Sequence, residues 1–155
     1  MHLTKKTVLI GIASLLIFGL AAWGVNVFLV MNNAQKSFDK NFIHFQAKSD
    51  DNETFITQGI GKKEAYNLSY SPAKKTIEIS KSIKNGDIYS SDSIYGAVKV
   101  YDIKQNANRY VFLTAAKPII VDFGITSVKV TYDGGHFETP YSELHFGETF
   151  PSEDN

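Results

Sequence analysis

The sequence predicts a mostly β protein in which an N-terminal transmembrane helix precedes a small antiparallel β-rich domain. Three observations support this fold class. Residues 8–31 form an apolar run of 24 residues without a charge. The remainder consists of short runs rich in β-branched and aromatic residues, which turn sequences separate. No window after residue 42 shows a convincing 3.6-residue apolar period. This pattern is compatible with an open sheet, a barrel or a sandwich, and it leaves the strand order undetermined.

Length and charge indicate a single exported domain. Beyond the apolar run, 124 residues remain, which is enough for one modest domain with a small core. Their 14 basic and 16 acidic residues provide no basic excess, so we expect no nucleic-acid partner. The absence of cysteine excludes disulfides, thiolate metal sites and cysteine nucleophiles. The predicted organisation is a cytoplasmic stub (1–7), a transmembrane signal anchor (8–31), a polar helical stem (32–41), an extracytoplasmic β-rich domain (42–149) and a flexible tail (150–155).

The apolar run is long enough to span a bilayer as a helix. At 1.5 Å per residue it reaches roughly 36 Å, against a hydrocarbon core of about 30 Å. The alternative is a signal peptide with Lys5 and Lys6 as its charged region and a cleavage site at Ala21 or Ala22. Because cleavage there would leave WGVNVFLVM as an apolar new N-terminus, we favour the uncleaved anchor.

The flanking charges predict the orientation of this helix. Lys5, Lys6 and the terminal amine precede the run, which favours a cytoplasmic N-terminus. We therefore expect a single-pass protein of the cell (inner) membrane with its C-terminal domain in the periplasm or outside the cell. Asn26 is a candidate contact to a partner helix, although solvation near the outer interface is the favoured explanation for it.

The exported domain shows clear strand and turn signals. Asn85-Gly86 and Asp133-Gly134-Gly135 predict two hairpin turns. Alternation over 127–132, and likewise over 97–103, indicates a sheet with one solvated face. The 124 residues after the apolar run include seventeen Phe and Tyr, which supply a large aromatic core for a domain without disulfides. The predicted strands are 42–47, 54–59, 65–70, 76–83, 88–90, 94–103, 110–115, 119–121, 127–132 and a last one from 137 onward, with 111–113 and 119–121 expected to be central.

Histidines are the main candidates for a functional site. His44, His136 and His145 are candidate pH-sensing residues, because imidazole titrates near neutrality and an exported domain experiences ambient pH. His136 and His145 also lie close to several glutamates, but their spacing matches no metal motif of fixed geometry, so we predict neither a metal nor a cofactor.

Catalytic signatures are weak. Ser71-Pro72-Ala73-Lys74 matches a bare S-x-x-K pattern, yet the other elements of a Ser-Lys enzyme are missing and Pro72 indicates a turn. We therefore predict no catalytic residues and no enzymatic activity. A small hydrolase that uses Ser71 and Lys74, or the C-terminal His and Glu residues, is the least favoured hypothesis.

These observations favour a binding function. The leading hypothesis is a single-pass membrane accessory or sensor protein whose β domain binds a partner membrane protein, such as a membrane-embedded regulator, or a small apolar ligand. The alternative is an envelope assembly factor, a chaperone-like protein, or an immunity or inhibitor factor that acts by strand addition.

Overall fold

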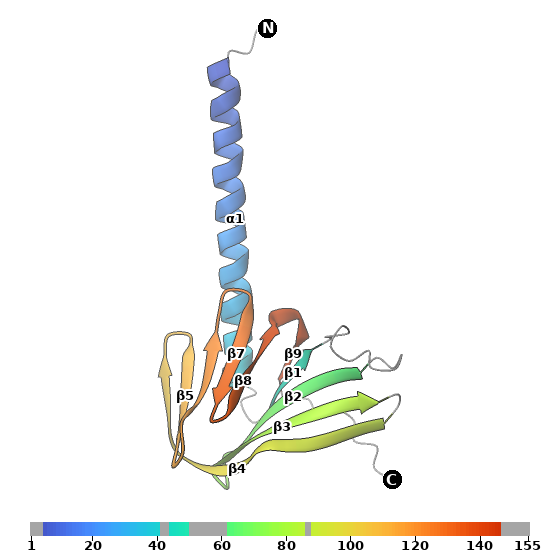
Figure 1. Cartoon of the computed structure of the whole chain (residues 1–155). Helices are drawn as coiled ribbons and strands as arrows, with labels where there is room; N and C mark the ends of the chain where they lie inside the picture. The colour runs from blue at the N-terminus through green and yellow to red at the C-terminus, as the bar shows by residue number, and fades with distance from the viewer. Residues whose placement is uncertain (1–4, 41–43, 50–61, 86–87, 147–155) are drawn as a thin grey trace.

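The computed structural model describes residues 5–40, 44–49, 62–85 and 88–146. A long N-terminal helix, α1 (Lys5–Lys40), emerges from one end of a β domain (Figure 1). The predicted fold class is confirmed. Within the described residues the domain contains β1 (His44–Ser49), β2 (Lys62–Ser71), β3 (Thr76–Asn85), β4 (Ile88–Asn106), β5 (Arg109–Thr114), β6 (Ile119–Phe123), β7 (Ser127–Tyr132), β8 (Gly135–Pro140), the 3-10 helix η1 (Tyr141–Glu143) and β9 (Leu144–Phe146).

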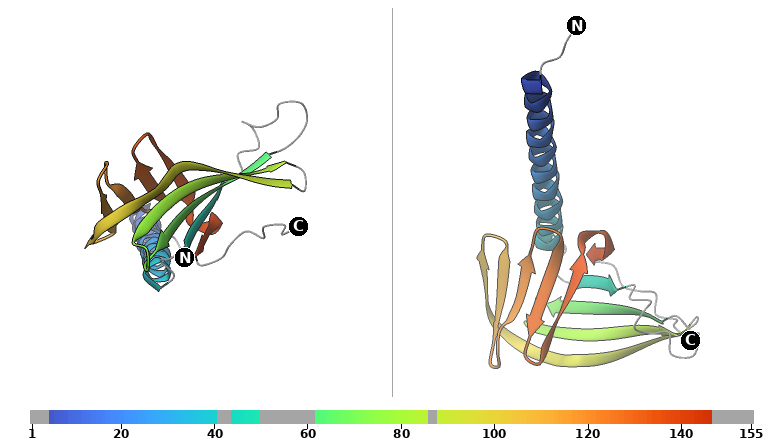
Figure 2. Two further views of the ribbon diagram at one scale, coloured as in Figure 1. Left: turned by 90° about the horizontal axis from the view of Figure 1, so that it is seen from below. Right: turned by 45° about the horizontal axis from the view of Figure 1, so that its top comes forward.

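The strands form one antiparallel sheet in the order β8-β7-β6-β5-β4-β3-β2-β1-β9. Neighbours in the sheet are neighbours along the chain, except that β9 returns to pair with β1. β8 and β9 are the two ends of this order, yet only the three residues of η1 connect them. Four peptide steps span at most about 14 Å, so the sheet must curl until its ends approach each other. Figure 2 shows the resulting half-barrel.

The long strand β4 forms the bend of the half-barrel. Its first part pairs with β3 and its second part pairs with β5. The register shifts between Val100 and Asp102, which inserts Tyr101 as an extra residue and leaves its side chain 65% exposed. Because a bulge bends a strand and interrupts its alternation, the regular pattern predicted over 97–103 is broken at Tyr101, and the strands predicted at 88–90 and 94–103 are one.

The inner face of the curl is the hydrophobic core. Along β6 and β7 every second residue is buried, as the alternation over 127–132 predicted. The two sides of the curl meet through aromatic pairs: Tyr66 on β2 stacks on Phe137 of β8 with ring centroids 4.7 Å apart. Tyr70 on β2 lies 6.2 Å from Phe112 of β5. The sheet therefore encloses packed side chains.

Two predicted turns connect strands as expected. Asn85 pairs with Ile88, which places the first hairpin between β3 and β4. Tyr132 pairs with Gly135, so Asp133 and Gly134 form a two-residue loop in which only Gly134 has a positive φ, of 104°. The predicted strand at 54–59 and the tail at 150–155 lie outside the described residues.

The helix has two parts with different surroundings. Val8–Lys40 is the one described segment that is long and apolar enough to cross a membrane, and residues 8–26 are all exposed. The helix continues without interruption into the predicted stem, where residues 25–40 include no Gly or Pro to end it. Phe38 in this stem is only 1% exposed and belongs to the core of the β domain.

Candidate functional site

The junction between α1 and the sheet combines a cluster of aromatic rings with side-chain hydrogen bonds. Phe38 inserts its ring among aromatic residues of three strands. Its ring centroid lies 4.8 Å from that of Tyr110 on β5 and 5.4 Å from that of Phe123 on β6. Phe146 on β9 lies 6.1 Å away on edge. The end of the helix thus packs against both the middle strands β5 and β6 and the edge strand β9.

Hydrogen bonds surround this aromatic cluster. The Gln35 side chain donates from Nε2 to the backbone carbonyl of Ala107, in the turn between β4 and β5, at 2.6 Å. The Tyr110 hydroxyl donates to the carboxylate of Asp39, and it accepts a bond from Nε2 of Gln105 at 3.0 Å. Because these bonds are directional, they orient the helix end as well as hold it.

The surroundings of the Tyr110 hydroxyl at this junction raise its pKa. Burial, and then its hydrogen bond to Asp39, raise the pKa of Tyr110 to about 12. The raised pKa keeps the phenol protonated, and hence a donor to Asp39, at alkaline pH values where an unperturbed tyrosine would ionise. A hydrogen bond to a charged acceptor is stronger than one between two neutral groups.

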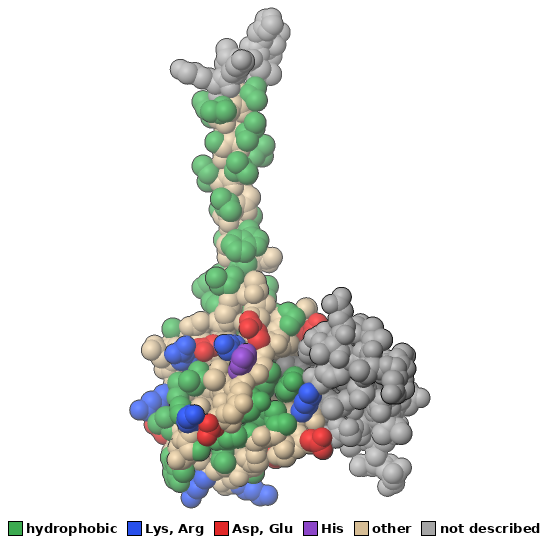
Figure 3. Space-filling view, viewed as in Figure 1, with side chains coloured by type: hydrophobic (Ala, Val, Ile, Leu, Met, Phe, Trp, Pro, Cys, Tyr) green, Lys and Arg blue, Asp and Glu red, His purple; other side chains and the backbone are tan. Residues whose placement is uncertain are grey.

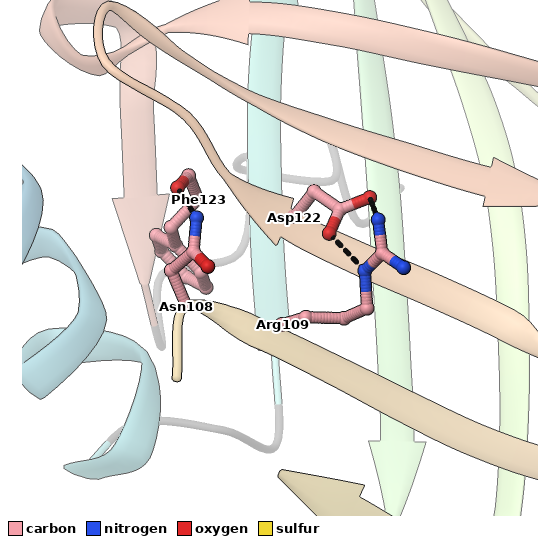
Figure 4. A network of polar contacts seen from close by, with 4 residues as sticks. All are labelled: Asn108, Arg109, Asp122 and Phe123. Carbon is pink, nitrogen blue, oxygen red and sulfur yellow. Dashed lines mark hydrogen bonds and ion pairs between the residues drawn. The ribbon is translucent and has the colours of Figure 1, made fainter. Parts of the chain in front are cut away.

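Three short segments form the end of the domain from which the helix emerges (Figure 1). They are residues 106–109, which run from the last residue of β4 to the first of β5, residues 124–126 between β6 and β7, and η1; together we call them the helix-side rim. Asn108 donates from Nδ2 to the carbonyl of Phe123 at 2.6 Å, as Figure 4 shows. The Tyr141 hydroxyl donates to the carbonyl of Gly124 at 2.5 Å. These bonds connect the three segments into one surface.

A row of alternating charges crosses the outer face just below this rim. Arg109 contacts Asp122 through two bonds, from Nε at 2.5 Å and from Nη2 at 3.2 Å (Figure 4). The register places Lys129 opposite Asp122 and Glu138 opposite Lys129. Blue and red side chains accordingly alternate on this face in Figure 3. Opposite charges on neighbouring strands stabilise the register modestly, so we assign this row a structural role.

The structure separates the three candidate pH-sensing histidines. His136 is exposed on the outer face of β8, where it pairs with Thr131. His44 and His145 lie on β1 and β9, and the partner of His145 is Gln46, two residues from His44. Only the backbone of these two is described. The pH-sensing role of all three stays a prediction.

The remaining candidates occupy ordinary positions. Asn26 lies exposed on the helix, within the apolar run. The Ser71 hydroxyl accepts a hydrogen bond from the backbone N–H of Lys74 at 3.3 Å, which closes a turn between β2 and β3. Where side chains are described, no group of three or more His, Asp or Glu residues is close enough to hold a metal ion.

Sequence reasoning did not identify Gln35, Phe38 and Asp39 as a site. A signal was present, because Met31 at the end of the apolar run and Ala34 and Phe38 in the stem follow one another at helical spacing on one side of the helix. All three pack on the core in the structure. The stem is therefore amphipathic rather than uniformly polar.

No protein-family model matches this chain, and neither a curated protein sequence nor a solved structure matches it. The fold and the junction together define a structural class: a single long apolar helix whose C-terminal turns are built into the core of an antiparallel β half-barrel.

Proposed function

We propose that this chain is a single-pass membrane protein whose β domain, outside the cytoplasm, binds a partner membrane protein as an accessory or sensor subunit. The observation that carries the proposal is the junction of Phe38 and Asp39 with Tyr110. A flexible tether would only keep the domain near the membrane. A helix that ends inside the core of the domain instead makes the domain move together with the membrane span.

This junction supports retention of the helix over its removal as a signal peptide. Cleavage at Ala21 or Ala22 would leave the docked end attached to residues 23–30, in which Trp23, Val25 and Phe28 are each at least 59% exposed. An exported protein with such an apolar projection would aggregate or bind membranes. A retained anchor keeps these side chains in lipid.

The attachment of α1 to the core of the domain supplies a mechanism for a sensor. If a partner tilts or rotates the helix in the bilayer, the domain turns with it, and a partner bound to the domain acts on the helix in return. The interior of the half-barrel is filled by fully buried side chains such as Phe112 and Phe123. A protein partner on the outside therefore fits the domain better than a small apolar ligand inside it.

The orientation can be tested with single cysteines, since the chain has none of its own. Lys117→Cys lies in an exposed turn of the domain, and Thr4→Cys lies in the N-terminal stub. In intact spheroplasts we expect a membrane-impermeant maleimide to label position 117 only, and to label position 4 after permeabilisation. The reverse pattern would overturn the proposed topology.

Partner binding can be tested by purification of the tagged full chain from its native membranes in a mild detergent. We expect one membrane protein to co-purify in fixed ratio with the wild type and not with an unrelated single-pass protein carrying the same tag. Recovery of the intact chain alone would contradict the accessory role.

The second candidate function is envelope assembly or inhibition by strand addition. β8 favours it, because this strand ends the sheet order and pairs on one side only with β7 among the described strands. Deletion phenotypes separate the two functions: loss of a transcriptional response indicates the sensor, whereas loss of surface assembly or resistance at unchanged transcription indicates the assembly or inhibitor role.

A further inference from the structure

We propose that the helix-side rim rests on the lipid bilayer and that Ile125, at the tip of the turn between β6 and β7, inserts into its headgroup layer. The proposal rests on the membrane anchoring proposed above. It adds a second site of membrane contact, which would fix the tilt of the domain on the membrane surface.

The position of the docked helix residues leaves little room between the rim and the membrane. Met31 is the last residue of the apolar run, and it already packs against the core of the domain. The run spans roughly 36 Å as a helix, which exceeds a hydrocarbon core of about 30 Å. The headgroup layer on each side is about 5–7 Å thick. The membrane-facing end of the domain therefore lies at the level of the headgroups.

The rim has the surface chemistry that this position requires. Outside the helix, three large apolar side chains are exposed among the residues whose side chains are described, namely Ile94, Tyr101 and Ile125, and only Ile125 belongs to the rim. Ile125 is 62% exposed. Its exposed neighbours in the rim are mostly uncharged, and the one basic residue there, Arg109, is engaged by Asp122. The exposed members of the rim are Asn106, Ala107, Asn108, Arg109, Ile125, Thr126 and Ser142.

The exposure of Ile125 is fixed by the structure of its turn. The backbone N–H of Gly124 donates to the carbonyl of Ser127 at 2.8 Å, and the carbonyl of Gly124 accepts from Tyr141. The backbone N–H of Tyr141 donates to the carbonyl of Thr126 at 3.4 Å. With both flanking residues bonded to η1, the apolar side chain between them cannot fold back onto the core without breaking these bonds.

Depth-dependent fluorescence quenching tests this placement. Three single-cysteine variants of the full chain carry the same environment-sensitive dye: Ile125→Cys in the rim, Ala116→Cys in the exposed turn at the far end of the domain, and Leu20→Cys in the middle of the span. Each is reconstituted into phosphatidylcholine vesicles without nitroxide, with a headgroup nitroxide, or with a nitroxide deep in the acyl chains.

We expect the headgroup nitroxide to quench position 125 several-fold more than position 116, and the deep nitroxide to quench position 20 most strongly. Equal, weak quenching at 125 and 116 with strong quenching at 20 would overturn the rim contact and leave the anchor intact. Absence of deep quenching at position 20 would overturn the anchoring itself. Since all variants carry one dye, its own affinity for lipid cancels in the comparison of 125 with 116.

Discussion

At the scale of single residues, Phe38 joins the two parts of the molecule. Its side chain is 1% exposed and contacts rings from the paired strands β5 and β6 and from β9, which lies at the other end of the sheet order. The hydrogen bonds around Phe38 contribute less to the stability of the junction than its ring does. A hydrogen bond contributes about 1 kcal/mol to the free energy of unfolding, whereas a fully buried Phe contributes several.

Phe38→Ala should therefore lower the free energy of unfolding of the domain by about 3–5 kcal/mol. The matched control is Phe28→Ala, which removes the same side chain from an exposed position of the same helix. The measurement is chemical unfolding of the full chain in detergent micelles, followed by tyrosine fluorescence. Equal effects of the two substitutions would contradict a core role for Phe38.

Two tyrosines allow the polar part of the junction to be measured separately. Tyr110→Phe removes the bond to Asp39 and should cost about 1–3 kcal/mol, since a charged acceptor loses its donor. Tyr95→Phe removes a buried hydroxyl that has no hydrogen-bond partner among the described residues, so we expect no loss of stability. A larger loss for Tyr95→Phe than for Tyr110→Phe in the same unfolding assay would refute this assignment.

Tyr110 and Tyr141 predict an alkaline limit of stability. Burial raises the folded-state pKa of Tyr110 and of Tyr141 to about 12, against 10.0 for an unperturbed tyrosine. Between pH 10 and 12 the two tyrosines are ionised in the unfolded state but still protonated in the folded state. The free energy of unfolding therefore falls as the pH rises through this range. The contribution is complete below pH 10 and is lost toward pH 12.

We expect Tyr110→Phe to make this decline shallower, because one of the two titrating groups is gone. The check is the midpoint of thermal unfolding of both proteins at a series of pH values from below 10, where the contribution is complete, up to about 12, the raised pKa. A decline of equal slope in both proteins would show that Tyr110 does not contribute.

At the scale of elements, the tight turns set the register of the sheet. Asp133 and Gly134 connect β7 to β8 in two residues, and the loop requires the positive φ of Gly134. A side chain at this φ is strained even though no neighbouring atom lies within 4 Å of a Cβ built there.

Gly134→Ala should consequently destabilise the domain by about 1–2 kcal/mol. Gly96→Ala is the control, because Gly96 in β4 has equal free space around it and no positive φ. Stability is again measured by unfolding in micelles. If Gly96→Ala costs as much as Gly134→Ala, backbone conformation is not the cause.

At the scale of the whole molecule, the proposed membrane anchoring makes the continuous helix responsible for both the rotation and the height of the domain above the bilayer. Seven polar helix-forming residues inserted between Val30 and Met31 would add nearly two turns, which preserves the rotation within about 20° and lifts the domain by about 10 Å. Met31 and every docked residue after it keep their contacts.

This insertion should leave the unfolding free energy unchanged while the headgroup quenching at a labelled Ile125→Cys falls to the level of Ala116→Cys. Fluorescence quenching in vesicles and unfolding in micelles, performed on the same variant, provide the two measurements. If position 125 is still quenched in the insertion variant, its contact with lipid does not depend on the height at which the helix holds the domain above the membrane.

The sequence by itself determined what depends on local pattern. An uncharged run of 24 residues is enough to indicate a span, and alternation over 127–132 indicates a strand with one buried face. The hairpins at Asn85 and Asp133 follow from turn chemistry within a few residues. These features need no information from elsewhere in the chain.

Only the tertiary structure decided the curl of the sheet, the bulge at Tyr101 and the place of Phe38. Each depends on contacts between segments far apart in the chain: β9 pairs with β1 about a hundred residues earlier, and Asp39 binds a hydroxyl 71 residues away. The spacing of Met31, Ala34 and Phe38 indicates that one side of the helix end is apolar, but it does not identify the strands that cover this side. The burial of Phe38 follows from the space that the curled sheet leaves at the helix end, and this space exists only once β5, β6 and β9 have come together.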